Sequence, residues 1–273
     1  MIVLGFDTST PSSAVGLRLP DGQTLQARDD PDRSPPTRRP GHATRLLALA
    51  AQLLERAGLS WRELERIAVG VGPGGFTGLR IGVASARGLA QSLGVELVGV
   101  SSLRALAVGA LGETGPAMDG VDCASGGGSP AVQGVLAAID ARRGEVFVGA
   151  YTRGPAPDAD GLRERLAPRP VTPREFGELC DWVDTDSPIP TARWIAVGNG
   201  AVLYRAELER ACIAVPPDGE EVHRPSGARI CEIAAAVTEA QPIDEVMPDY
   251  LREPDAEIAL ERRRAHAATG ASV

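Results

Sequence analysis

The sequence has few of the residues that metal and disulfide sites require. Its 273 residues include three histidines and four cysteines, and no two cysteines form a C-x-x-C pair. Scattered cysteines argue against a zinc knuckle and against a disulfide framework. The histidines, at 42, 223 and 266, give no local signature of a serine or cysteine nucleophile with its base. We therefore expect a chain that binds no metal and no cofactor.

Long apolar runs and an excess of positive charge are also missing. No run reaches the length of a membrane span, and the N-terminus MIVLGFDTS lacks the positive start and long apolar segment of a secretory signal. The formal net charge is −8, whereas a protein that binds nucleic acid by itself needs clustered positive charge. We expect a cytoplasmic protein with no membrane contact, which reaches RNA only through a partner.

Glycine, by contrast, is abundant at the centre of the pattern. Residues 66–71 are apolar and rich in β-branched side chains, and GPGG follows at 72–75. This predicts a buried strand that ends at a glycine turn. Thr77 is expected to cap the first turn of a helix over residues 77–93, and Gly94 is expected to end it. A second buried strand follows, up to Val100.

The glycine turn has two interpretations. Backbone amides exposed at the start of a helix can bind a phosphate. However, a P-loop needs Gly-Lys-Ser/Thr, and here Phe76 and Thr77 follow Gly75 with no lysine nearby. The spacing also differs from the dinucleotide fingerprint. The alternative is tight packing of strand against helix, which the missing lysine favours.

Small residues lie along the same helix. Gly78, Gly82 and Ser85 are on a different face from the apolar stripe, and Gly88 costs about 1 kcal/mol relative to alanine in a helix interior. These residues predict the close approach of another backbone. Since the sheet of the same chain takes the apolar stripe, we expect a partner on the small-residue face.

The first hundred residues predict the element order β-β-β-α-β-α-β. Three strands at 2–6, 14–19 and 24–27 form a meander, with a turn at PDGQ. The Pro-rich, charged segment 28–41 is expected to be a loop. The expected helix at 42–57 ends at Gly58, and a capping box of Ser60 and Glu63 precedes the central strand.

The second half repeats this beginning. After a helix that ends near Leu111 and a Gly-rich insertion at 112–131, expected to be disordered, a strand at 135–139 leads into Asp140. The turn ARRG and a strand at 145–152 follow, so the unit strand-Asp-turn-strand occurs twice, first at residues 2–19. Such repetition predicts a duplicated fold.

Four segments carry a resemblance to a known family. They are MIVLGFDTST, the central motif GVGPGGFTGLRIGVASARGLAQSLGVELVGVSSLRALA, AAIDARRGEVFVGAY and PDYLREPDAE. Together they resemble the bacterial TsaB family, also called YeaZ. The resemblance implies an α/β fold with two ribonuclease H-like lobes, as in the actin, sugar kinase and Hsp70-like (ASKHA) superfamily. It places one lobe at 1–102 plus about 222–256, a smaller lobe at 103–221 and a flexible tail at 257–273.

The resemblance also implies a function. Family members take part in making N6-threonylcarbamoyladenosine (t6A) at position 37 of tRNAs that read codons beginning with A. A synthase makes threonylcarbamoyl-adenylate, the paralogous transferase TsaD moves the group to tRNA, and the ATPase TsaE completes the complex. TsaB is then a non-catalytic partner in a direct heterodimer with TsaD, and a possible homodimer when free.

Family members pair through their first two long helices, which correspond to residues 42–57 and 77–93 of this sequence. The resemblance implies an interface at Leu46, Leu49, Ala50, Leu53, Gly78, Arg80, Gly82, Val83, Ala86 and Arg87.

The two repeated turns argue against a working nucleotide site. In the ASKHA superfamily, phosphates lie between the two strand-Asp-turn-strand hairpins, held by backbone amides and by a metal that the aspartates orient. Here Pro11 stands in the first turn, and Arg142 and Arg143 stand in the second. We expect a degenerate site in which Asp7 and Asp140 are turn-capping carboxylates. The alternative function is an ATP-dependent kinase or transferase of this fold.

A metal site of the transferase type is not expected either. The paralogous transferase binds its metal with two histidines four residues apart on a helix. Here His42 has Leu46 at that spacing, and one histidine cannot hold a catalytic metal unaided. Thr44 replaces the acid that the family usually has two residues after this histidine.

Overall fold

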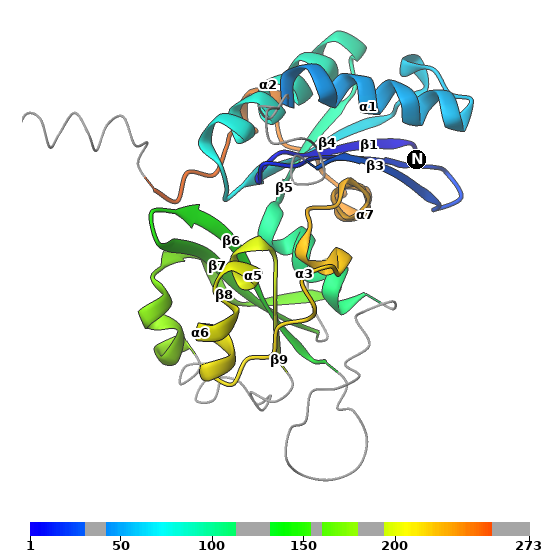
Figure 1. Cartoon of the computed structure of the whole chain (residues 1–273). Coiled ribbons are helices and arrows are strands. Elements are labelled where there is room, and N and C mark those ends of the chain that lie inside the picture. The colour runs from blue at the N-terminus through cyan, green and yellow to red at the C-terminus, as the bar shows by residue number, and fades with distance from the viewer. Residues whose placement is uncertain (31–41, 113–131, 154–159, 180–193, 253–273) are drawn as a thin grey trace, which may run out of the picture.

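The computed structural model describes residues 1–30, 42–112, 132–153, 160–179 and 194–252, without the side chains of 42–44 (Figure 1). Two mixed sheets, one of five strands and one of four, form two α/β lobes. The expected insertion and tail, and the loop beyond residue 30, lie outside the described residues. Among the helices that are described, none has the length and apolar character needed to cross a membrane.

The first lobe contains the five-stranded sheet. Its strands are β1 (Val3–Asp7), β2 (Ser13–Arg18), β3 (Thr24–Asp29), β4 (Arg66–Gly72) and β5 (Glu96–Ser101). Their spatial order is β3-β2-β1-β4-β5, in which the β1-β2-β3 meander is antiparallel and β1, β4 and β5 are parallel. The predicted order of elements is therefore confirmed for this lobe.

Helices cover both faces of this sheet. The helices α1 (His42–Ala57) and α2 (Phe76–Leu93) lie on one face, and α7 (Gly227–Ala236) lies on the other (Figure 1). Phe6 packs in the cluster with α1 and α2, whereas Val3 packs with α7. Because side chains alternate along a strand and both faces are covered, the inner strands β1 and β4 are nearly continuous apolar runs.

The second lobe repeats the first four strands. Its strands are β6 (Gly134–Arg142), β7 (Glu145–Arg153), β8 (Leu162–Val171) and β9 (Trp194–Val197), in the order β8-β7-β6-β9. The pairs β6-β7 and β7-β8 are antiparallel, and β6-β9 is parallel. This pattern matches β3-β2-β1-β4 of the first lobe, so the sheet topology shows the predicted duplication.

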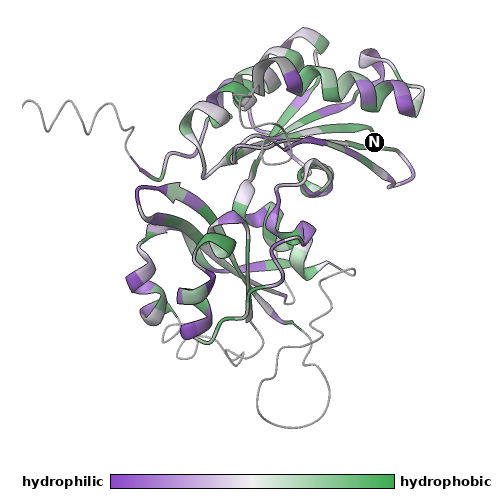
Figure 2. Cartoon of the chain, in the orientation of Figure 1, coloured by the Kyte–Doolittle hydropathy of each residue, from purple (hydrophilic) through white to green (hydrophobic). Residues whose placement is uncertain are grey.

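The helix α3 (Ser102–Leu111) follows β5 and packs its Leu103 and Leu106 in a cluster with the second sheet. It also contacts α7, so it lies between the lobes (Figure 1). Two short helices, α5 (Asn199–Leu203) and α6 (Arg205–Arg210), pack Ala201 and Leu208 against the other face of the second sheet. Figure 2 shows hydrophobic segments along the strands between these layers.

Four single turns of 3-10 helix complete the described fold: η2 (Trp61–Glu63), η3 (Pro173–Glu175), η5 (Glu221–His223) and η6 (Ile243–Glu245). The predicted capping box of Ser60 and Glu63 is confirmed before η2, and the structure has a second capping box before η3. Ser60 N and Ser60 Oγ donate to Glu63 at 2.7 and 2.9 Å, and Thr172 N and Oγ1 donate to Glu175 at 2.6 and 2.7 Å.

Two predictions about the ends of elements are wrong. The segment 28–41 was expected to be a loop from its first residue, but Arg28 and Asp29 belong to β3, where they pair with Ala14 and Ser13. The helix α2 begins at Phe76, and its N-cap is Gly75 without a side-chain hydrogen bond, so Thr77 does not cap it. Thr77 instead lies inside the first turn, because the glycine turn brings the chain into the helix two residues earlier.

Candidate functional site

A cleft of about 360 Å³ lies between the lobes where the two repeated hairpins end. Its lining includes Thr10, Pro11 and Ser12 from the β1-β2 turn, and Asp140 from β6. Asn199, at the start of α5, and His223 of η5 line it as well. This is the position at which the sequence predicted a degenerate nucleotide site.

Asp7, at the end of β1, is almost fully buried. Its Oδ1 accepts hydrogen bonds from Ser9 N at 2.9 Å and Ser9 Oγ at 2.6 Å, and its Oδ2 accepts one from Ser102 Oγ at 2.7 Å. A β-carbon on Gly70 would lie closer than 3.0 Å to the same carboxyl group. Asp7 therefore fixes the first turn to α3, and its oxygens are already used by protein donors.

Asp140 has the equivalent position in the second lobe and is partly exposed. Its Oδ1 accepts a hydrogen bond from Arg142 N at 2.8 Å, and its Oδ2 lies 3.6 Å from Arg142 Nε. Arg142 and Arg143 have φ angles of 65° and 55°, a left-handed conformation that is uncommon outside glycine. Both aspartates thus accept hydrogen bonds from amides of their own turns, as the turn-capping interpretation predicts.

The charges around the cleft do not favour a phosphate. Asp30, Asp140 and Asp218 line it, together with the cation Arg224. His223 adds no positive charge at neutral pH, because burial lowers its pKa. A triphosphate entering this cleft would meet more carboxylates than cations.

The tautomer of His223 follows from its two neighbours. Its Nδ1 accepts a hydrogen bond from Gly198 N at 3.2 Å, and its Nε2 donates to Pro216 O at 2.9 Å. The neutral ring therefore ties η5 to the turn after β9. Among the described residues, no group of three or more His, Cys, Asp and Glu side chains is placed to hold a metal ion.

The glycine turn before α2 contacts the first hairpin directly. Gly75 N donates a hydrogen bond to Ser9 O at 2.7 Å, and a β-carbon on Gly74 would lie closer than 3.0 Å to Ser9. The N–H group of Gly75, at the start of α2, is therefore already hydrogen-bonded within the chain. Of the two interpretations of this turn, close packing of the backbone is the one that these contacts support.

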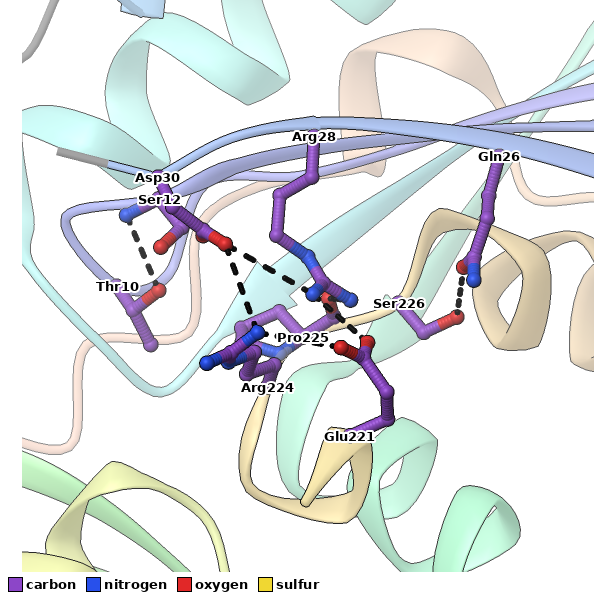
Figure 3. Close-up of polar contacts among 9 residues, drawn as sticks. All are labelled: Thr10, Ser12, Gln26, Arg28, Asp30, Glu221, Arg224, Pro225 and Ser226. Carbon is purple, nitrogen blue, oxygen red and sulfur yellow. Dashed lines mark hydrogen bonds and ion pairs between the residues drawn. The ribbon is translucent and has the colours of Figure 1, made fainter. Parts of the chain in front are cut away.

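A polar network joins the lobes beside the cleft (Figure 3). Arg28 of β3 donates from Nη1 to Glu221 of η5 at 2.8 Å and from Nη2 to Pro225 O at 3.1 Å. Arg224 Nη1 donates to Glu221 at 3.1 Å, and both arginines lie 3.9 Å from Asp30 Oδ2. Figure 3 shows the two guanidinium groups converging on Glu221. This network anchors the segment that returns from the second lobe to the first.

The predicted interface residues of α1 and α2 are mostly inside the chain. Those that are buried are Leu46, Ala50, Leu53, Gly78, Gly82, Val83 and Ala86. A β-carbon on Gly82 would lie closer than 3.0 Å to Thr8 Oγ1, and Thr8 Oγ1 donates to Gly78 O at 2.8 Å. The prediction that these glycines face a partner protein is therefore wrong, because the group that packs against them is the side chain of Thr8, just after β1 of the same chain.

The other predicted interface residues keep some exposure. Leu49 and Arg87 are partly buried, and Arg80 is exposed. The spacing of small residues along α2 indicated a close contact, but the side chain that fills it, Thr8, is 70 residues away in sequence and left no signal. Sequence reasoning also did not predict that the segment after η6 contacts α2, where its Met247 and Tyr250 lie on the surface.

The fold and the two hairpins define a class of protein. Two lobes with the same sheet order, each with a strand-Asp-turn-strand hairpin at the cleft, make this chain a two-lobed α/β protein with a duplicated sheet topology. The model of the family TsaD, tRNA N6-adenosine threonylcarbamoyltransferase, matches residues 34–164.

Similarity to individual proteins extends over almost the whole chain. The chain is 29% identical over 255 residues to the tRNA threonylcarbamoyladenosine biosynthesis protein TsaB of Escherichia coli, which covers 92% of this chain and 95% of that protein. It is 30% identical over 256 residues to an uncharacterized protein of Mycobacterium tuberculosis, covering 93% of each. The structure of YeaZ from Pseudomonas aeruginosa superposes with a TM-score of 0.67 at 26% identity, covering 91% of this chain and all of that one. The chain belongs to the TsaB family, also called YeaZ.

Proposed function

We propose that this chain is a non-catalytic subunit of the complex that makes N6-threonylcarbamoyladenosine at position 37 of tRNAs reading codons that begin with A. It binds the transferase TsaD directly, TsaE is the ATPase of the complex, and tRNA reaches this chain only through the complex. The names of its relatives support the pathway. Its net charge of −8 supports a role without independent RNA binding. We place the complex in the cytoplasm.

The proposal of a non-catalytic role rests on one observation: the carboxylates of the two repeated aspartates already accept hydrogen bonds from the protein itself. Asp7 accepts from Ser9 and Ser102, and Asp140 accepts from Arg142. A kinase of this fold needs carboxylates free to orient a metal and turn amides free to hold phosphates. The carboxylate-rich lining of the cleft supports the same conclusion.

The alternative is an ATP-dependent kinase or transferase of the same fold. The two functions differ in what the purified chain binds alone. For the proposed subunit, calorimetry with ATP and Mg²⁺ should show binding weaker than the micromolar range. A dissociation constant of about 1 μM would instead favour the kinase.

Reconstitution tests the function itself. We would combine tRNA, the synthase, TsaD and TsaE, with and without this chain, and measure the modified nucleoside by mass spectrometry. Omitting the chain should abolish modification, whereas Asp140→Asn should retain it, because that carboxylate serves a turn. If Asp140→Asn still binds TsaD but abolishes modification, the chain is catalytic and the proposal is wrong.

A further inference from the structure

The strand β8 forms a positively charged edge on an acidic protein. In the described structure it pairs only with β7, and its sequence LRERLAPRPV contains three arginines and one glutamate. The whole chain, by contrast, has a formal net charge of −8. Positive charge is therefore concentrated at this edge of the second lobe.

Four arginines at this edge are exposed, and we call them the arginine row. They are Arg153 at the end of β7, Arg163 and Arg169 of β8, and Arg174 of η3. None of the four forms an ion pair with another residue in the part of the chain that the structure describes. Their charge is thus available to a partner.

The two arginines of the row that belong to β8 lie on the same face of the sheet. Arg163 is opposite Thr152 and Arg169 is opposite Val148, and these two partners are four residues apart on β7. Because side chains alternate along a strand, residues four apart share a face and are separated by about 13 Å. The row therefore extends along the edge instead of gathering at one point.

The acids in and beside β8 do not neutralise the row. Glu164 is opposite Tyr151, which belongs to the cluster on the other face of the sheet. Asp160, just before β8, forms an ion pair with an arginine of α3. Glu175 interacts with the charge of Arg169, but its carboxylate already accepts two hydrogen bonds from the threonine that caps η3.

The edge is closed to a further β-strand. Pro168 and Pro170 have no N–H group, and the pairing of β8 with β7 has two irregularities. Both features prevent a strand from another chain from extending the sheet. A partner at β8 must therefore contact its side chains, and arginine side chains fit phosphate and carboxylate groups.

We propose that the arginine row binds the phosphate backbone of the tRNA while this chain is part of the complex. The inference rests on the proposed function and assigns a tRNA contact to the second lobe. A row of about 13 Å spans several phosphates of a nucleic-acid strand, which favours a nucleic acid over a single acidic side chain of a protein. Contacts of this kind position the tRNA without reading its sequence.

The place of the row in the fold agrees with this role. β8 belongs to the second lobe, whereas α1 and α2, the helices through which family members pair, cover the first (Figure 1). A transferase bound at those helices leaves the row exposed. Four arginines on a chain of net charge −8 are too few to hold tRNA alone, so the free chain should not bind it measurably.

The test measures binding of a fluorescently labelled tRNA to the complex of the full-length chain with TsaD, by anisotropy at several NaCl concentrations. Arg163→Glu and Arg169→Glu should each weaken binding by about fivefold and reduce the slope of log affinity against log salt by about one. Arg163→Lys should recover most of the affinity, because a phosphate contact needs the charge. Arg62→Glu, exposed on η2 of the first lobe, is the matched charge control and should bind within about twofold of wild type.

Charge reversal also separates tRNA binding from protection of the edge. Charged residues and prolines protect edge strands against aggregation, and charge of either sign serves that purpose. The glutamate variants therefore keep the protection and lose only the attraction to phosphate. If both bind tRNA as tightly as Arg62→Glu, with an unchanged salt slope, the row protects the edge and the inference is wrong while the proposed function stands.

The remaining outcomes are equally distinct. If the wild-type chain does not bind TsaD, the proposed function is wrong and the inference falls with it. If the glutamate variants lose TsaD while the lysine variant keeps it, the row holds an acidic protein surface and the inference is overturned. Should Arg163→Glu fail to fold, as judged by circular dichroism, Arg174→Glu decides, because that residue lies outside the sheet.

Discussion

The hydroxyl group of Thr8 fills the space beside Gly82 that a β-carbon would need. A β-carbon there would lie closer than 3.0 Å to Thr8 Oγ1, and the same oxygen donates to Gly78 O at 2.8 Å. Because neither glycine has a side chain, α2 packs closely against Thr8, which follows Asp7 at the start of the first turn of the cleft. One contact therefore sets the position of the helix and of the turn.

This contact predicts opposite effects at two glycines of one helix. Gly82→Ala should lower the free energy of unfolding by about 1–3 kcal/mol, because the added methyl group overpacks against Thr8. Gly88→Ala is the control: Gly88 is exposed with nothing within 4 Å, so alanine should raise stability by up to about 1 kcal/mol. Urea denaturation of both variants measures the difference. Equal effects would show that Gly82 is not packed as described.

The fold was largely predictable because most of its strands are buried on both faces. Apolar runs with glycine or aspartate at their ends located β1, β2, β4, β5, β6 and β7, and the capping box of Ser60 and Glu63 located η2. β8 was missed. Its sequence LRERLAPRPV has charges and two prolines, since it is an edge strand paired only with β7, and an edge strand needs no apolar alternation.

The residue types at the site could be read from the sequence, but their contacts could not. The residue types at Pro11, Arg142 and Arg143 predicted a weak nucleotide site from the turns alone. The burial of Gly82, however, depends on Thr8. The position of residues 246–252 depends on the hydrogen bond from Arg80 to Tyr250, which are 170 residues apart. Long-range partners of this kind have no local pattern, so sequence reasoning placed a partner protein where Thr8 lies.

Ser102 should matter for stability through Asp7. Its hydroxyl donates to the buried Asp7 Oδ2 at 2.7 Å. Ser102→Ala removes a hydrogen bond to a buried carboxylate, so we expect a loss of about 1.5–3 kcal/mol. Ser92→Ala, which removes an exposed hydroxyl bonded to Gly88 O, should change stability by less than about 0.5 kcal/mol. Thermal unfolding compares the two, and similar melting temperatures would contradict the anchoring role of Asp7.

The network at Glu221 should control local opening between the lobes. Arg28→Ala removes the donor to Glu221 and Pro225, so η5 loses its attachment to β3. Amide hydrogen exchange at His223 and Arg224 should become faster by roughly tenfold, which corresponds to about 1.4 kcal/mol of local opening. Arg62→Ala, at an exposed position away from the network, should leave these amides unchanged. Unaltered protection in Arg28→Ala would show that the network does not hold η5.

His223 should make stability depend on pH. Burial lowers its pKa below the ordinary value of 6.5, so the folded protein favours the neutral ring more than the unfolded chain does. Above pH 6.5 both states are neutral, and the contribution to stability is fully present. As pH falls below 6.5, the unfolded chain binds the proton first, so the free energy of unfolding decreases until pH reaches the folded pKa.

His223→Gln isolates this effect, because glutamine does not titrate. We would measure urea unfolding of both proteins at pH 7.5 and 5.5. The wild type should lose more stability than the variant over this interval, although the variant starts lower because it changes the hydrogen bonds to Gly198 and Pro216. Burial raises the pKa of Asp249, which acts in the opposite direction but equally in both proteins. Parallel pH profiles would therefore mean that His223 does not remain neutral inside the fold.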